Sequence, residues 1–239
     1  KLSDPKVRLM ILCNPQNPSG MLWDAAVLAR VGELCEKHGV TVISDEIHCD
    51  LTAPGYEYTP FASVSDVCLN NSITCIAPTK AFNIAGVHSS AVMISDTKLK
   101  NRIRKGLRRD QLAEPGSLSV DAAIAAFNEG EEWLDALREY IEENKRIFRE
   151  FVLKELPEIS VVKGNATYLL WLDFSNIVRG NEDIAEEIRK TTGLFMSTGS
   201  IYGNAGKKFA RINLACPRST LHQGMQRLKE GVRNYWNGP

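Results

Sequence analysis

The chain has 239 residues, 44% of them hydrophobic, which suffices for one large domain or a domain and a half with a real core. Its 29 basic and 29 acidic residues give a formal net charge of zero, so no overall charge attracts it to nucleic acid or to an anionic membrane. No apolar run approaches the length of a membrane span. The composition predicts a soluble globular chain, with the cytoplasm as the expected location.

The first half of the chain alternates predicted strands with predicted helices. Apolar and β-branched runs predict strands over residues 7–13, 40–44, 72–76 and 91–95. Asp24 is a suitable N-cap and Gly39 a suitable stop signal, so a helix is predicted over residues 24–38. Another helix is predicted over residues 98–109. This alternation is typical of an α/β fold with a mainly parallel sheet.

The second half begins with two predicted helices, over residues 119–128 and from Glu131 to about residue 156. The longer one should bury a stripe of apolar residues at helical spacing, namely Trp133, Leu134, Leu137, Tyr140, Ile141, Ile147, Phe148, Phe151 and Val152. The remainder predicts strands over residues 161–162, 168–173, 194–197 and 209–215, with helices over residues 181–192 and 220–235. Residues 157–239 should therefore form a small α+β domain.

Seven basic residues crowd the predicted helix 98–109, which raises the question of a nucleic-acid contact. They scatter around the helix and no aromatic residue interleaves with them. We therefore expect a solvated or subunit-facing helix, and no nucleic-acid partner.

The six cysteines include no CxxC pair and no metal-ligand spacing, so we expect structural thiols and no metal site. Cys49 is the exception, because it follows a candidate site and would be reactive if its pKa were lowered there.

The chemistry concentrates where predicted strands end. Lys80 follows strand 72–76, and an amine that loses hydration there can attack a carbonyl carbon, although a lone lysine in such a place is more often a surface residue. Two Asn-Pro pairs closed by Ser-Gly follow strand 7–13, and Asp45, Glu46 and His48 follow strand 40–44. Because open α/β sheets bind ligands at the carboxyl ends of their strands, we expect these three segments to converge.

Four motifs in order carry a resemblance to a known family. They are Asn-Pro-Ser-Gly at residues 17–20, Ser-Asp-Glu-Ile-His at 44–48, Thr-Lys-Ala-Phe-Asn-Ile-Ala-Gly at 79–86 and Phe-Ala-Arg-Ile-Asn at 209–213. The chain resembles the fold-type I pyridoxal-phosphate (PLP) enzymes of aminotransferase class I/II. Its amino-acid sequence at residues 45–50, 59–63 and 214–220 is most similar to that of the MalY/PatB branch of carbon–sulfur lyases.

The resemblance implies a cofactor site. Lys80 would bond to PLP, Asp45 would face the pyridine nitrogen, and Asn17 and His48 would donate hydrogen bonds to the phenolic oxygen of the cofactor. Most class members have tyrosine where His48 stands, so cofactor tuning should be more sensitive to pH here. Thr79 would bind the phosphate.

The resemblance also implies that Arg211 binds the α-carboxylate of the substrate. A guanidinium can form two parallel hydrogen bonds to a carboxylate, a geometry that lysine cannot supply. Two phosphate-binding residues of many aminotransferases are replaced by Ala77 and His88. Family members have on the order of 100–150 further residues before the Asn-Pro loop. We therefore expect a C-terminal fragment, inactive when isolated, and a homodimer when full length.

The implied domains are a partial PLP-binding large domain at residues 1–118, interdomain helices at 119–156 and a small C-terminal α+β domain at 157–239. The implied reaction is α,β-elimination on cystathionine- or cysteine-like amino acids, which gives thiol, ammonia and an α-keto acid. Two alternatives stay open: a class I/II aminotransferase, and the PLP domain of a ligand-sensing transcription regulator.

Overall fold

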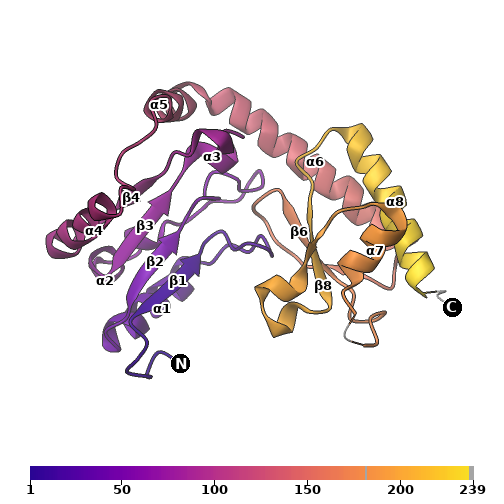
Figure 1. The fold of residues 1–239 in the computed structure, drawn as a ribbon, viewed down its shortest axis with the longest axis horizontal. Helices are drawn as coiled ribbons and strands as arrows, with labels where there is room; N and C mark the ends of the chain where they lie inside the picture. The colour runs from indigo at the N-terminus through magenta and orange to yellow at the C-terminus, as the bar shows by residue number, and fades with distance from the viewer. Residues whose placement is uncertain (181, 237–239) are drawn as a thin grey trace. The chain divides into compact units, whose positions relative to one another are not determined.

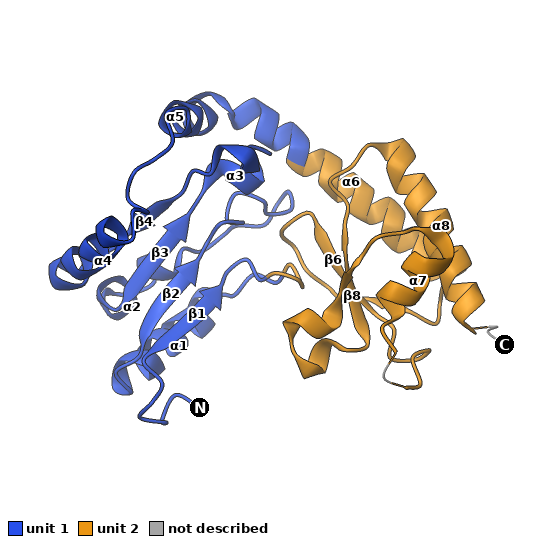
Figure 2. Cartoon of the chain, viewed as in Figure 1, with its two compact units in different colours: residues 1–16, 21–137 blue, residues 17–20, 138–239 orange. Residues whose placement is uncertain are grey.

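The computed structural model describes residues 1–180 and 182–236, and these form two compact units (Figure 2). Unit 1 comprises Lys1–Gln16 and Met21–Leu137, and unit 2 comprises Asn17–Gly20 and Arg138–Pro239. The chain passes from one unit to the other inside helix α6 (Glu131–Glu155). The assignment of residues 1–118, 119–156 and 157–239 to three functional domains stays a prediction.

Unit 1 is built on a four-stranded sheet with the order β1-β2-β3-β4 (Figure 1). Strands β1 (Leu9–Cys13), β2 (Thr41–Asp45) and β3 (Ser72–Ile76) are parallel, and β4 (Ala91–Met93) pairs antiparallel with β3. The predicted, mainly parallel α/β sheet is therefore confirmed, with one antiparallel edge strand.

One face of this sheet packs on helices α1 (Ala25–Lys37) and α2 (Asp66–Asn70). Leu28, Cys35, Val42, Phe61 and Cys68 form its buried core. The predicted cap of α1 is confirmed, since the Asp24 side chain accepts a hydrogen bond from the amide of Val27 at 2.8 Å. The helix thus lies where the sheet needs an apolar cover.

Three further helices complete unit 1: α3 (Pro78–Ala81), α4 (Thr97–Arg109) and α5 (Ser119–Glu129). Helix α3 is one turn long and was not predicted, although Pro78 at its first position is a known helix-start signal. The ring of Phe82, directly after α3, stacks on Trp133 at 6.0 Å between ring centroids and meets Phe127 edge-on at 5.9 Å. These rings hold the end of α3 against α5 and the start of α6.

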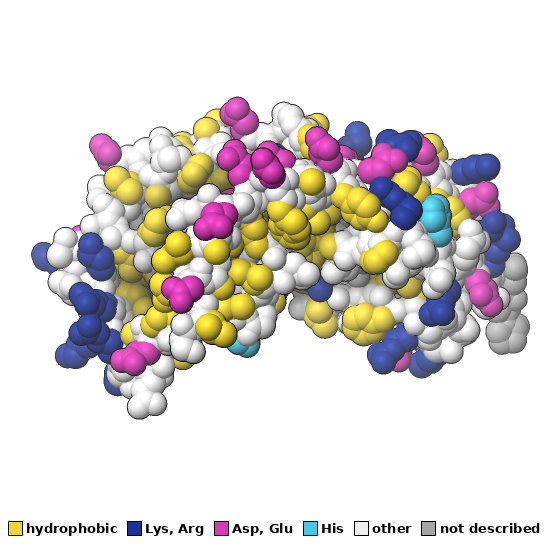
Figure 3. Space-filling view, turned by 90° about the horizontal axis from the view of Figure 1, so that it is seen from above, with side chains coloured by type: hydrophobic (Ala, Val, Ile, Leu, Met, Phe, Trp, Pro, Cys, Tyr) yellow, Lys and Arg dark blue, Asp and Glu magenta, His cyan; other side chains and the backbone are white. Residues whose placement is uncertain are grey.

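All seven basic side chains of α4 are exposed. Figure 3 shows dark blue side chains gathered at the end of unit 1 where α4 lies. Leu99, Ile103 and Leu107 are half-buried and recur at helical spacing, so the helix has a narrow apolar stripe and a broad solvated side.

Unit 2 has a four-stranded antiparallel sheet with the order β5-β6-β8-β7. Its strands are β5 (Ser160–Val161), β6 (Leu169–Asp173), β8 (Phe209–Asn213) and β7 (Ser197–Thr198), and its helices are the later part of α6, α7 (Ile184–Thr192) and α8 (Arg218–Trp236). Its core includes Phe148, Val152, Leu172, Ile188 and Leu228. The predicted α+β organisation is confirmed.

The main differences from prediction in unit 2 concern β7 and the start of α7. The predicted strand over residues 194–197 is wrong, because Gly193 turns the chain with φ +73° and Phe195 is 68% exposed. In this segment, only Ser197 and Thr198 pair with β8. Helix α7 begins at Ile184 because Asp183 caps it; the predicted start, Asn181, lies outside the described residues.

The buried stripe of α6 is partly as predicted. Ile141, Phe148 and Val152 are buried, but Trp133 is 47% and Tyr140 40% exposed. Two polar residues of α6 that were not predicted to be buried, Asn144 and Lys145, are enclosed instead. Asn144 donates to the carbonyl oxygens of Leu214 at 2.8 Å and Cys216 at 3.1 Å, so its burial is compensated. No helix in the described part of the chain is long and apolar enough to cross a membrane.

Candidate active site

Asp45 is the last residue of β2, at the carboxyl end of the parallel strands. Its Oδ1 accepts a hydrogen bond from the amide of Ile47 at 3.3 Å, and its Oδ2 accepts a long one of 3.9 Å from the Cys13 thiol. Within residues 1–180 and 182–236 it forms no ion pair. The carboxylate is half-buried and keeps lone pairs available for a charged donor.

Cys13 and Cys75 flank Asp45 on the neighbouring strands, directly opposite it in the sheet register. Burial raises the pKa of both thiols, and the negative charge of Asp45 raises it further. Both thiols therefore stay protonated near neutral pH.

The turn after β2 is fixed by Glu46, which is 2% exposed. Glu46 Oε1 accepts hydrogen bonds from the Ser44 hydroxyl at 2.8 Å and the Phe61 amide at 3.1 Å. His48 is 5% exposed, in the same turn. Sequence reasoning gave Glu46 no role, although an acid between Asp45 and His48 was a signal that it could be buried and hydrogen-bonded.

Lys80 lies in α3, and the single residue Ala77 separates this helix from the end of β3 at Ile76. Because β3 is the direct neighbour of β2 and parallel to it, Lys80 and Thr79 lie at the same carboxyl end of the strands as Asp45 and His48. Lys80 is half-buried and, among the described residues, forms no hydrogen bond or ion pair. An amine in this state is available for covalent chemistry.

Asn17 and Arg211 lie together in unit 2. Arg211 is in β8, and its Nη1 donates to Asn17 Oδ1 at 3.1 Å while its Nη2 donates to the Ser197 hydroxyl at 3.0 Å. The guanidinium also lies 5.7 Å from the ring centroid of Tyr202. Ser197 and Tyr202 were not predicted, because only the pairing of β7 with β8 brings them to Arg211.

The Arg211 guanidinium has five N–H donors, and the two contacts above leave others for a planar anion. The positive charge of Arg211 also acts on Tyr168. Burial raises the pKa of the Tyr168 phenol, and the charge of Arg211 partly opposes this rise. The arrangement suits a carboxylate. The convergence of this pair with Asp45 and Lys80 of unit 1 stays a prediction.

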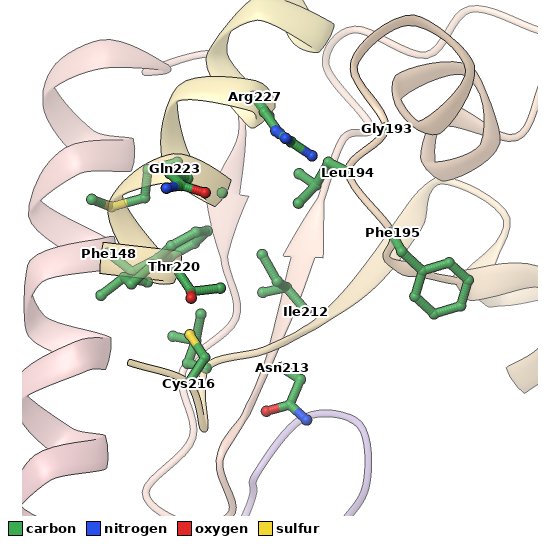
Figure 4. A pocket seen from close by; sticks show the side chains of 14 residues that line it. Phe148, Gly193, Leu194, Phe195, Ile212, Asn213, Cys216, Thr220, Gln223 and Arg227 are labelled. Carbon is green, nitrogen blue, oxygen red and sulfur yellow. The ribbon is translucent and has the colours of Figure 1, made fainter. Parts of the chain in front are cut away.

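A pocket of about 300 Å³ in unit 2 does not coincide with Arg211. Figure 4 shows Ile212 of β8, Phe148 of α6 and Thr220 of α8 around it. Ile212 follows Arg211 in the strand, and consecutive side chains of a strand point to opposite faces. The pocket therefore lies on the other side of the sheet from the Arg211 guanidinium.

Cys49 is not an activated thiol. Burial, with the negative charges of Asp50 and Glu46, raises its pKa to about 12. The Cys49 pKa is therefore raised and not lowered, because the acidic neighbours disfavour the thiolate. We expect iodoacetamide at pH 8 to label Cys49 at least about 100-fold more slowly than free cysteine, as followed by peptide mass spectrometry. Labelling at the rate of free cysteine would contradict this.

The amino-acid pattern behind this geometry matches one family model. The model described as aminotransferase class I and II matches residues 1–228. The chain belongs to this family. Among curated members, the cystathionine beta-lyase PatB of Bacillus subtilis is 44% identical over 97% of the chain, and protein MalY of Escherichia coli is 33% identical over 97%. The chain spans about 60% of the length of each of these two relatives, 60% for PatB and 59% for MalY.

Solved structures of the family superpose closely. A PLP-bound putative aminotransferase from Clostridium difficile 630 has a TM-score of 0.93 at 38% identity, covering 97% of this chain and 59% of that one. A PLP-bound C-S lyase from Staphylococcus hominis has a TM-score of 0.89 at 33% identity, covering 97% of this chain and 56% of that one. The family assignment and the predicted PLP-transferase-like fold are therefore confirmed.

Proposed function

We propose that the whole protein is a PLP-dependent enzyme and that unit 1 of this chain supplies the lysine and the carboxylate that hold the cofactor. The observation that carries this is that Asp45 and Lys80 both lie at the carboxyl ends of the neighbouring parallel strands β2 and β3. Among the described residues, the Asp45 carboxylate forms no ion pair and the Lys80 amine forms no hydrogen bond or ion pair. Both fit PLP, which offers an aldehyde to an amine and a pyridine nitrogen to a carboxylate. When bound, PLP supplies an electron sink for the amino-acid substrate.

Each candidate residue has a defined task in this proposal. Asp45 would favour a proton at the pyridine nitrogen by its negative charge, and His48 and Asn17 would donate hydrogen bonds to the phenolic oxygen. Thr79 and nearby backbone amides bind the phosphate. Lys80 would hold PLP through its amine and would serve as the base for the proton on the substrate Cα.

Arg211 binds and orients the substrate carboxylate. Its contacts with Asn17 and Ser197 restrict the guanidinium, so the fork need not be ordered anew when a substrate arrives. The substrate class is an amino acid that is bound through its α-carboxylate.

The reaction we propose is α,β-elimination at sulfur. Lys80 removes the Cα proton, the Cβ–S bond breaks and the electron pair leaves with the thiolate. One water is consumed in releasing ammonia and the 2-oxo acid. Support comes from PatB, named a cystathionine beta-lyase, and from the Staphylococcus hominis C-S lyase.

Transamination is the second candidate, supported by the putative aminotransferase from Clostridium difficile. It uses Lys80, Asp45 and Arg211 in the same way. The difference would be that the Cβ substituent stays on the substrate while Lys80 carries the Cα proton.

The two reactions are separated by their products. We expect the whole protein, incubated with cystathionine, to release thiol and 2-oxo acid in equal amounts. In a parallel incubation with several amino acids and 2-oxoglutarate, we expect at least tenfold less glutamate. Glutamate without thiol would assign the protein to the aminotransferases, and neither product would contradict both candidates.

We also propose that the whole protein is a homodimer in the cytoplasm. The family resemblance supports the dimer. Light scattering coupled to size-exclusion chromatography tests the mass, and a mass of one chain would contradict it; fractionation of cells tests the location.

A further inference from the structure

Helix α6 places a lysine inside unit 2 for which the reaction above has no task. The side chain of Lys145 is 1% exposed. Its Nζ donates to the carbonyl oxygen of Ala166 at 3.3 Å and lies 3.7 Å from Glu142 Oε2. A buried ammonium is costly, so such a residue usually stabilises something specific.

A second cation of α6 reaches the same loop. Arg149 Nη2 donates to the carbonyl oxygen of Gly164 at 3.2 Å, and its Nη1 pairs with Glu142 Oε1 at 3.2 Å. The loop over residues 164–167 is therefore attached to α6 through two of its carbonyl groups.

The other side of this loop holds the segment Asn17–Gly20. The amides of Asn165 and Ala166 both donate to the Gly20 carbonyl oxygen, at 2.9 Å and 3.0 Å. The backbones touch so closely that a Cβ at Gly164 would lie 2.0 Å from the Ser19 carbonyl oxygen. A Cβ at Gly20, whose φ is +71°, would lie 2.6 Å from the Ala166 carbonyl oxygen.

The segment ends in the contact between Asn17 and Arg211. Asn17 Oδ1 accepts from Arg211 Nη1 at 3.1 Å. Lys145 is thus connected to the guanidinium proposed to bind the substrate carboxylate by hydrogen bonds at Ala166, Gly20 and Asn17 and by the backbone of residues 17–20.

We propose that Lys145 is a positioning residue, which fixes the Asn17–Gly20 segment through Ala166 and so orients Asn17 and Arg211 for the substrate carboxylate. The part concerning substrate rests on the proposed function. The part concerning the segment rests on the contacts within unit 2 alone.

The charge state of Lys145 gives this role a pH dependence. Burial lowers the pKa of its ammonium to about 8, Arg149 lowers it as well, and Glu142 opposes them. Glu142 and Arg149, the two charged groups that shift this pKa, both belong to α6, and the Ala166 carbonyl oxygen of the loop accepts the Lys145 hydrogen bond. Lys145 is therefore cationic at pH 7 and largely neutral at pH 9, where its attraction to Glu142 and to the carbonyl is weaker.

The test compares three variants of the whole protein with wild type. Lys145→Met removes the charge and the donor, Lys145→Arg keeps both, and Lys154→Met is the matched control because Lys154 is an exposed lysine of the same helix. At pH 7 we expect Lys145→Met to raise KM about tenfold with kcat changed less than about threefold, and Lys145→Arg to recover part of the loss. The ratio of KM between Lys145→Met and wild type should fall as the pH rises from 7 to 9.

Hydrogen exchange provides a readout that needs no turnover. Protection of the Asn165 and Ala166 amides should fall at least about tenfold in Lys145→Met and stay unchanged in Lys154→Met. Wild-type protection and wild-type KM in Lys145→Met would overturn the proposal. If Lys145→Met does not fold, the same amides in wild type decide: protection, corrected for intrinsic exchange, must fall between pH 7 and pH 9. Absence of any turnover by wild type would count against the proposed function, while the exchange data would still judge Lys145.

Discussion

Replacing Lys80 by alanine is expected to lower kcat of the whole protein by about 10⁴-fold. The variant loses both the amine that bonds to PLP and the base that takes the Cα proton, and a positioned general base alone contributes about 10²- to 10⁴-fold. Steady-state thiol release from cystathionine measures the effect.

Lys98→Ala is the matched control, because Lys98 is an exposed lysine of unit 1 on α4. It should retain wild-type kcat. Thermal unfolding of PLP-free Lys80→Ala should match PLP-free wild type, since the Lys80 side chain forms no hydrogen bond or ion pair among the described residues. More than about a tenth of wild-type kcat in Lys80→Ala would contradict its catalytic role.

Replacing Asp45 by asparagine is expected to lower kcat by about 10²- to 10³-fold. A neighbouring carboxylate raises the pKa of a cationic acid by about 1–3 units, and each unit corresponds to about 1.4 kcal/mol. Without that charge the pyridine nitrogen of bound PLP loses its proton more readily. Asp66→Asn, an exposed position on α2, should behave as wild type.

Asp45→Asn has a second readout that does not depend on turnover. The Asp45 charge contributes to the raised pKa of Cys13 and Cys75, so asparagine should bring both thiols closer to their ordinary pKa. Alkylation of Cys13 and Cys75 at a given pH should then be faster than in wild type. Unchanged alkylation together with unchanged kcat would show that Asp45 has no electrostatic role at this sheet edge.

Local sequence signals predicted the fold well where one interaction dominates. Strand β3 was predicted residue for residue, since its apolar and β-branched run is followed by Pro78. Asp24 and Gly39 defined α1 because capping and a left-handed turn are decided within a few residues. The strand predicted at 194–197 failed at residues 194–196 because strand formation depends on a partner, and in this segment only Ser197 and Thr198 pair with β8.

The residues of the candidate site were likewise predictable only where local sequence or sheet topology places them. The topology of a parallel sheet predicts that Asp45 and Lys80 lie at one edge, because both follow neighbouring strands. The hydrogen bond between Asn17 and Arg211 joins residues 194 positions apart, so local spacing could not give it. Lys145 was missed because a lysine in a helix is usually solvated, and only tertiary packing buries it.

The most direct test of the central proposal is the identity of the lysine that bonds to PLP. Borohydride reduces the carbon–nitrogen double bond between that amine and the cofactor, and the stable product can be found by peptide mass spectrometry. We expect the pyridoxyl group on Lys80, in stoichiometric amount, when the whole protein is saturated with PLP, and none on the Lys80→Ala variant. A pyridoxyl group on any other lysine, or on none, would contradict the assignment of Lys80 and of the cofactor site in unit 1.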